Sequence, residues 1–254
     1  MTFIDTHTHL YSEEFDEDRT ACIQRAIEKG VTRLYFPAID SSYTDKMLST
    51  KNLFPDHVFL MAGLHPCSVK ENFKEEWKKV KEFMDKYPFC GIGETGLDFY
   101  WDTTFKNLQI ENLHQHIQWA IEYKKPLILH TRNSMDEAID IAGQYKGSAL
   151  RGIFHCFTGT KEQAEKIIEF GFFLGIGGVL TFKNSGLDKV IREIDLSHLV
   201  LETDSPYLAP VPYRGKRNES SYIPAIAQKL AEVKNCKIEE IAEKTTANAL
   251  AIFG

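Results

Sequence analysis

The sequence of 254 residues lacks the patterns that accompany export, disulfide cross-linking or a membrane span. Its first residues hold neither a basic segment nor an apolar one, so we expect no secretory signal. The longest apolar stretch, 170–182, is interrupted by four glycines and is shorter than the ~20 residues of a transmembrane helix. The five cysteines are odd in number, scattered and never spaced C-x-x-C, as is typical of free thiols. We therefore expect a cytoplasmic protein without membrane contact.

Several catalytic motifs are also missing. There is no G-x-S-x-G, no G-x-x-x-x-G-K-[ST] and no H-E-x-x-H, which argues against serine hydrolases, P-loop enzymes and zincins. Residues 91–96 do fit G-x-G-x-x-G, but residues 97–100 do not begin a helix and Glu94 would repel a pyrophosphate. We expect no dinucleotide cofactor.

Excess basic charge is absent as well. The chain has 30 Lys and Arg against 36 Asp and Glu, a formal net charge of -6, so it has no overall positive field for a phosphate backbone. A nucleic-acid partner would therefore have to bind at a local positive site, such as metal ions or one basic loop. The composition, 43% hydrophobic and 26% charged, is otherwise that of a globular protein with a sizeable core.

Short β-rich runs alternate with longer amphipathic ones along the whole chain. This alternation predicts about eight strand–helix units, the repeat of a (β/α)₈ barrel. A doubly wound open sheet shares the pattern and is the main alternative. No linker, repeat or composition shift divides the chain, so we expect a single-domain, TIM-like α/β barrel over residues 1–254. The expected strands are residues 3–6, 32–37, 58–64, 89–94, 127–130, 152–155, 172–176 and 199–203.

Side chains that bind metals recur where these expected strands end. His7 and His9 are two residues apart on the first strand, so both point to the same side. In a barrel the C-terminal strand ends form one rim, where active sites are built. A single histidine at a strand end is more often an ordinary hydrogen-bonded residue. The prediction of a metal site therefore rests on the convergence of several such residues on one rim. The other rim residues are His65, Glu94, His130, His155 and Asp204.

Four of these imidazoles with two carboxylates can hold two divalent ions, with one carboxylate bridging them. Histidine ligands favour Zn²⁺ or Mn²⁺ as the bound ions, and Mg²⁺ remains possible for activity. The remaining histidines are left out of the site, because they fall on a helix or at strand beginnings. They are His57, His114, His116 and His198.

Basic side chains are expected near the same rim. Arg132 follows His130 by two positions and should share its direction, although a loop-bracing role is equally open. The irregular stretch 206–221 is long enough to be a functional loop. Its Arg214, Lys216 and Arg217 stand among tyrosines, a mixture that suits a nucleic-acid strand but also describes a solvated charge run.

Taken together, seven segments resemble the TatD family of metal-dependent deoxyribonucleases within the amidohydrolase superfamily. The resemblance implies a TIM-like barrel of the metal-dependent hydrolase type. Two residues depart from the family pattern, Ser220 where proline is common and Thr95 where isoleucine is common. The segments are IDTHTHL (4–10), GLHP (63–66), GETGLD (93–98), LHTR (129–132), HCFTG (155–159), ETDSPYL (202–208) and RGKRNE (214–219).

The resemblance also implies roles for the rim residues. His65 and Arg132 would lie near the scissile phosphate. Glu94 stands where many superfamily relatives have a carboxylated lysine, and a glutamate at this position is typical of TatD proteins. The implied two-metal centre has His7, His9 and Asp204 on one ion, His130 and His155 on the other, and Glu94 between them.

We therefore expect a hydrolase that cleaves DNA phosphodiesters, as an exonuclease on single-stranded ends, through metal-activated water. Asp204 would take the proton of the water, while His65 and Arg132 stabilise charge on the phosphoryl oxygens. Arg132, Arg214, Lys216 and Arg217 would bind the DNA. Two alternatives remain: a small-molecule hydrolase of amides, lactones or phosphotriesters on the same centre, and a non-catalytic nucleic-acid-binding module. No obligate protein partner is expected.

Overall fold

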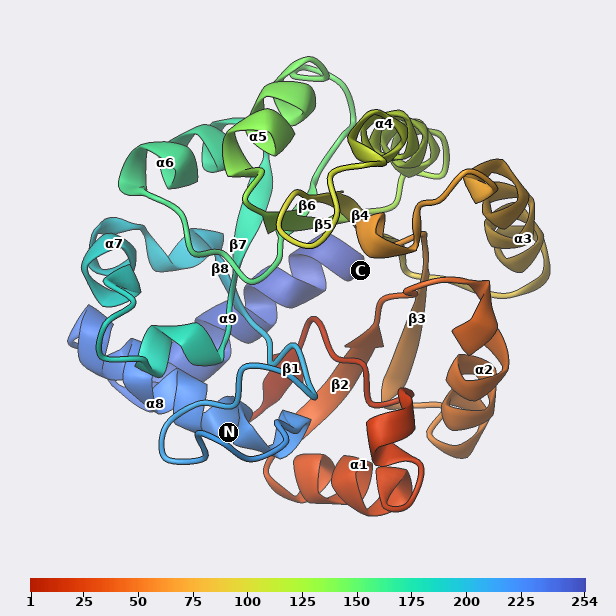
Figure 1. Cartoon of the computed structure of the whole chain (residues 1–254). Coiled ribbons are helices and arrows are strands. Elements are labelled where there is room, and N and C mark those ends of the chain that lie inside the picture. Colours follow the sequence, from red (N-terminus) through yellow and green to blue (C-terminus); the bar gives the residue numbers. More distant parts are fainter.

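Eight parallel strands pair in strict chain order in the computed structural model, which describes residues 1–254. Figure 1 shows them at the centre, surrounded by helices. The strands are β1 (Phe3–Asp5), β2 (Val31–Phe36), β3 (Val58–Ala62), β4 (Gly91–Asp98), β5 (Leu127–Arg132), β6 (Gly152–Phe154), β7 (Phe172–Ile176) and β8 (Leu199–Leu201).

Backbone hydrogen bonds bring the two ends of this sheet together. The N–H of Thr6 donates to the carbonyl of Leu201 at 3.0 Å, and a parallel bridge joins Thr8 to Ser205. A doubly wound sheet would instead reverse its strand order at a switch point. The strict order and the closure confirm the single-domain (β/α)₈ barrel and exclude the open sheet.

The helices form an outer ring, and the last of them crosses one end of the barrel (Figure 1). Ala249 and Ile252 of this last helix pack on strand residues that point inward, such as Ile4 and Val200. The helix also bonds to residues that precede strands, Thr2 and Arg151, so it covers the end opposite the rim at the C-terminal strand ends. The helices are α1 (Arg19–Glu28), α2 (Thr44–Leu53), α3 (Phe73–Lys86), α4 (Lys106–Glu122), α5 (Met135–Gly143), α6 (Lys161–Glu169), α7 (Leu187–Glu193), α8 (Ile223–Lys234) and α9 (Ile238–Phe253).

Strand β4 is longer than expected from the sequence, which places its end at Glu94. It continues to Asp98 because glycines let it approach β5 closely. Gly96 pairs with His130, and a Cβ atom at Gly96 would lie 2.1 Å from the carbonyl oxygen of His130. The G-x-G-x-x-G match is therefore part of a strand and forms no phosphate-binding turn.

The helices also bear on the expectation about membranes. None of them combines the length and the apolar character that a membrane crossing requires. The longest, α4, has 17 residues and carries buried polar groups such as Gln109 and Asn112.

Candidate metal centre

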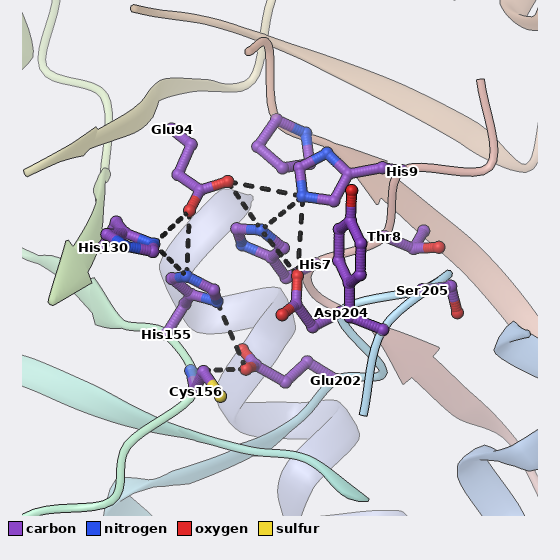
Figure 2. Close-up of polar contacts among 12 residues, drawn as sticks. His7, Thr8, His9, Glu94, His130, His155, Cys156, Glu202, Asp204 and Ser205 are labelled. Carbon is purple, nitrogen blue, oxygen red and sulfur yellow. Dashed lines mark hydrogen bonds and ion pairs between the residues drawn. The ribbon is translucent and has the colours of Figure 1, made fainter. Parts of the chain in front are cut away.

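Glu94 lies at the centre of the rim, and its two carboxylate oxygens face different groups of side chains (Figure 2). Its side chain is only 2% exposed. Oε2 lies 3.1 Å from Nε2 of His7 and 3.4 Å from Nε2 of His9. Asp204 completes this first group, with its Oδ1 atom 3.5 Å from Nε2 of His9 and 3.8 Å from Nε2 of His7.

The other oxygen of Glu94, Oε1, faces a second group of imidazoles. It lies 2.9 Å from Nδ1 of His130, 2.9 Å from Nε2 of His155 and 3.3 Å from Nε2 of His65. Nδ1 of His130 and Nε2 of His155 are 3.3 Å apart. The structure thus brings together all the rim residues expected from the sequence and places His65 among them.

The spacing of these donor atoms fits metal ions. Ligands about 2.0–2.2 Å from a tetrahedral ion lie roughly 3.3–3.6 Å from one another. Within the first group, Nε2 of His7 and Nε2 of His9 are 3.2 Å apart, and the distances to Glu94 and Asp204 are similar. Three sets of three residues offer ligand atoms within 4.8 Å of one another, and together they include His65, His130 and His155. A cation at each oxygen of Glu94 would satisfy this convergence of lone pairs.

Hydrogen bonds on the outer side of the rings fix which nitrogen faces Glu94. Nδ1 of His9 donates to the hydroxyl of Tyr11 at 2.7 Å, and that hydroxyl donates to the carbonyl of Pro37. This arrangement leaves the lone pair of His9 on Nε2, toward Glu94. Tyr11 was not expected from the sequence as part of the site, although it follows His9 by only two positions.

Buried carboxylates also lie on the outer side of His130 and His155. Asp98 Oδ2 accepts from Nε2 of His130 at 3.0 Å, which leaves Nδ1 for the cluster. Glu202 Oε1 lies 3.5 Å from Nδ1 of His155, a contact drawn as a dashed line in Figure 2. Such outer partners orient metal-binding histidines and raise their basicity. The sequence interpretation overlooked both, although Asp98 is four residues beyond Glu94 on β4.

The carboxylates and imidazoles of the cluster shift one another's pKa values. Burial would raise the pKa of Glu94, but the imidazoles of His155, His65 and His7 hold that pKa well below its usual range. Burial likewise would lower the pKa of His155, yet Glu94 and Glu202 raise it well above its ordinary value. The buried carboxylates are therefore stable in their ionised form only beside positive charge, which cations bound at the cluster can supply.

The loops after the strands hold several residues in the left-handed region. The φ angle is 48° at Cys156 and 56° at Asp204, where non-glycine residues are uncommon. At Cys156 the chain has already left β6, which ends at Phe154, and the N–H of Cys156 donates to Oε1 of Glu202 at 2.5 Å.

Comparison with known proteins decides the family. The family model described as TatD related DNase matches residues 4–254. The chain belongs to the TatD family. It is 36% identical over 250 residues to an uncharacterized metal-dependent hydrolase, YabD, of Bacillus subtilis, with 98% of each chain covered. These findings confirm the resemblance found in the sequence and the prediction of a metal-dependent hydrolase of this family.

Two further relatives carry the TatD name. The chain is 29% identical over 255 residues to the 3'-5' ssDNA/RNA exonuclease TatD of Erwinia tasmaniensis, with 98% of each chain covered. The crystal structure of the TatD homologue YJJV of Escherichia coli K12 superposes with a TM-score of 0.91 at 26% identity, over 99% of this chain and 97% of that one. The whole TatD barrel is therefore present here.

The two departures from the TatD pattern find polar partners. Thr95 is buried, and its Oγ1 accepts from the amide of Asn112 at 3.2 Å. Ser220 is also buried, with its Oγ 3.2 Å from Oγ1 of Thr8. Both hydroxyls are thus satisfied inside the fold, beside segments that carry rim residues.

The basic residues expected to bind substrate lie in different surroundings. The guanidinium of Arg132 lies over the ring of Tyr100, 3.9 Å from its centroid. Arg217 pairs with Asp18 of the segment before α1 at 2.7 Å, and Arg214 lies over the ring of Phe182. Lys216, between them, is exposed. The structure therefore does not gather these four cations into one cluster.

Histidines that the sequence analysis set aside have structural partners. His116 is fully buried on α4, where Nδ1 donates to the carbonyl of Asn112 and Nε2 accepts from the N–H of Leu64. Nδ1 of His57 lies 2.8 Å from the carbonyl of Thr32, at the beginning of β3. Neither residue takes part in the cluster around Glu94.

Proposed function

We propose that this TatD protein is an exonuclease that uses bound divalent ions to remove nucleotides from single-stranded ends of DNA. The observation that carries the proposal is the position of Glu94, with one carboxylate oxygen facing His7 and His9, which also contact Asp204, and the other facing imidazoles only. A bridging carboxylate of this kind is suited to two ions that act on one phosphate. The name of the Erwinia relative supports a single-stranded nucleic-acid substrate.

In this proposal each candidate ligand binds one of two ions or bridges both. His7, His9 and Asp204 would hold one ion, His130 and His155 the other, and Glu94 both. Zn²⁺ or Mn²⁺ suits this imidazole-rich set, while Mg²⁺ prefers oxygen ligands. When bound, such ions lower the pKa of a coordinated water toward neutrality and offset negative charge on phosphoryl oxygens.

Asp204 would accept the proton of the attacking water. Its side chain is 15% exposed, against 2% for Glu94, so it faces the open rim. Burial would raise its pKa, but the hydrogen bond with His9 and the charges of His155 and His7 lower it, which keeps the carboxylate ionised at neutral pH. An ionised carboxylate at the rim is in the state that a proton acceptor requires.

His65 and Arg132 would stabilise the charge that develops on the phosphate. Nε2 of His65 lies at the edge of the second imidazole group, and Arg132 follows His130 on β5 by two positions. Positioned donors of this type stabilise the transition state more than the ground state. Arg214, Lys216 and Arg217 would contact the strand further from the scissile bond.

We also propose that residues 1–254 act as one catalytic unit in the cytoplasm. All five cysteines are unpaired, as suits a reducing compartment. The net charge of -6 includes the carboxylates assigned to the ions, so the rim of the loaded enzyme is more positive than the sum suggests.

The decisive experiment removes metal with a chelator and restores Zn²⁺, Mn²⁺ or Mg²⁺ singly. End-labelled single- and double-stranded DNA and RNA are then assayed beside a phosphotriester and a lactone, with Glu94→Gln as the variant that breaks the bridge. We expect stepwise loss of nucleotides from single-stranded DNA that depends on metal and on Glu94. Turnover of the small molecules alone would assign the centre to that chemistry, and binding of DNA without any turnover would leave a binding module.

A further inference from the structure

The loop between β4 and α4 exposes aromatic side chains beside the candidate metal centre. Trp101 is 68% exposed and Tyr100 is 53% exposed, with their ring centroids 4.9 Å apart in an edge-to-face pair. The other two tryptophans, Trp77 and Trp119, pack against the protein. Large aromatic groups left in water at a rim indicate a surface that binds something.

Each aromatic ring of this loop is paired with a cation. The guanidinium of Arg132 lies 3.9 Å from the ring centroid of Tyr100 and 5.0 Å from that of Trp101. The ammonium of Lys106 lies 4.2 Å from the ring of Phe99, and that of Lys70 lies 4.9 Å from the ring of Phe105. Lys70 and Lys106 also pair with carboxylates, Asp102 at 3.8 Å and Glu137 at 3.6 Å, so Arg132 is the cation of this group that is left for a phosphate.

One carboxylate connects this loop to the metal centre. Asp98 accepts from the backbone N–H groups of Tyr100 at 3.0 Å and Trp101 at 3.3 Å through Oδ1, while Oδ2 accepts from Nε2 of His130. Phe99 also donates its N–H to the carbonyl of Arg132 at 2.9 Å. The aromatic pair is therefore tied by its backbone to the partner of a candidate ligand, within reach of a strand whose phosphate lies at Glu94.

We propose that Tyr100 and Trp101 form a stacking platform for unpaired bases of the nucleic-acid strand whose end enters the metal centre, with Arg132 beside the rings to contact the phosphate. Aromatic rings bind the face of any base, and neighbouring Arg and Lys side chains contact the phosphates. In a duplex the base faces are covered by stacking and pairing, so the platform selects single strands. This inference rests on the proposed function and explains how the same centre would discriminate against duplex DNA.

Binding is tested without cleavage, on full-length protein in chelator, by the fluorescence anisotropy of labelled oligothymidylate. Two further probes are an oligonucleotide of equal length with abasic residues near its end, and a blunt duplex. The abasic probe keeps the phosphates but removes the bases. We expect the oligothymidylate to bind best, and the intrinsic fluorescence of Trp101 to fall as it binds.

Variants separate stacking from charge. Trp101→Ala should weaken oligothymidylate binding about tenfold, within the range for one stacked base, and should remove the preference over the abasic probe. Trp101→Phe keeps a ring and should restore most of both. Tyr87→Ala is the matched control, because Tyr87 is an exposed aromatic residue that precedes β4, at the opposite end of that strand.

Equal binding of the two single-stranded probes by the wild type, or unchanged binding by Trp101→Ala, would overturn the platform. Failure of the proposed function looks different: the wild type would bind oligothymidylate with the expected preference but cleave no nucleic acid with any metal. Conversely, cleavage by the wild type with an unchanged KM in Trp101→Ala leaves the function and removes the platform.

Discussion

Asp98 and His130 are joined by a contact of 3.0 Å between Oδ2 and Nε2, on the side of the ring away from Glu94. The carboxylate fixes the ring orientation and keeps the proton on Nε2, so that Nδ1 presents its lone pair to the cluster. Partners of this type affect metal affinity about as strongly as a weak ligand does.

Asp98→Asn should therefore lower the affinity of the protein for Zn²⁺ by roughly 10–100-fold. The measurement is titration of metal-free protein against a chromophoric chelator, which needs no substrate. Asp102→Asn is the matched control, since Asp102 is an exposed carboxylate of the same loop. If the two variants bind Zn²⁺ with equal affinity, Asp98 only holds the loop in place and does not affect the metal site.

The role of Asp98 could not be predicted from the sequence alone. Alternation and length were enough for the barrel, and residue type at the strand ends was enough for His7, Glu94 and His130. Strand β4, however, contains glycines where a strand usually has branched residues, so its last four residues were not recognised as strand. Only its close pairing with β5, in which Asp98 lies opposite Arg132, shows that Asp98 shares a face with the cluster.

The loop after β8 shows a second limit. Arg217 belongs to a basic, tyrosine-containing stretch, and its composition suggests substrate binding as readily as a surface role. Its pairing with Asp18, which is 199 positions away in the sequence, depends on how α1 packs beside that loop. Contacts between such distant segments follow from the fold and cannot be read from local composition.

Gly175 on β7 leaves room for Glu202, the buried partner of His155. A Cβ atom at Gly175 would lie 2.1 Å from Oε2 of Glu202, and the Cα of His155 lies close on another side. Gly175→Ala should therefore lower the free energy of unfolding by about 1–3 kcal/mol, the usual cost of overpacking. Urea denaturation monitored by circular dichroism measures it.

Gly177→Ala serves as the control for this change. Gly177 is two residues further along, and a Cβ there would meet the nearest atom at an ordinary 3.6 Å, with φ at -111°. We expect a smaller loss for this variant. If both alanine variants unfold at the same urea concentration as the wild type, Glu202 is free to move and cannot hold His155 in place.

His116 makes the stability of the barrel depend on pH. Burial lowers its pKa from 6.5 to about 4, although the hydrogen bond from Nδ1 to the carbonyl of Asn112 opposes the shift. Between these two pKa values the unfolded chain binds a proton at this histidine and the folded chain does not. The free energy of unfolding therefore falls as pH drops from 6.5 toward 4, by up to about 3 kcal/mol from this group.

His116→Gln isolates the effect, since a glutamine can accept from Leu64 but does not titrate. The difference in unfolding free energy between wild type and variant should shrink as pH falls from 7 to 4, measured by urea denaturation at several pH values. His114→Gln removes a partly exposed histidine of the same helix and is the control. A difference that is constant with pH would show that His116 is not the group responsible.

Asp204 is the residue whose replacement tests the chemistry with least disturbance of the fold. Its φ of 56° lies in the left-handed region, which asparagine tolerates almost as well as aspartate. The backbone bonds from Asp204 N–H to His7 and from Tyr207 N–H to Asp204 do not involve the side chain. Asp204→Asn should thus keep the melting temperature within a few degrees of the wild type.

The same variant loses the carboxylate that accepts the proton and contributes to the first ion. Turnover of single-stranded DNA should fall by about 10²–10⁴-fold, the usual contribution of a positioned base, while oligonucleotide binding in chelator should not change. Asp188→Asn, a change at a partly exposed residue in the first turn of α7, is the control for expression and folding. Because binding, stability and turnover are measured on one variant, a loss of turnover alone assigns Asp204 to the reaction, and undiminished turnover removes it from that role.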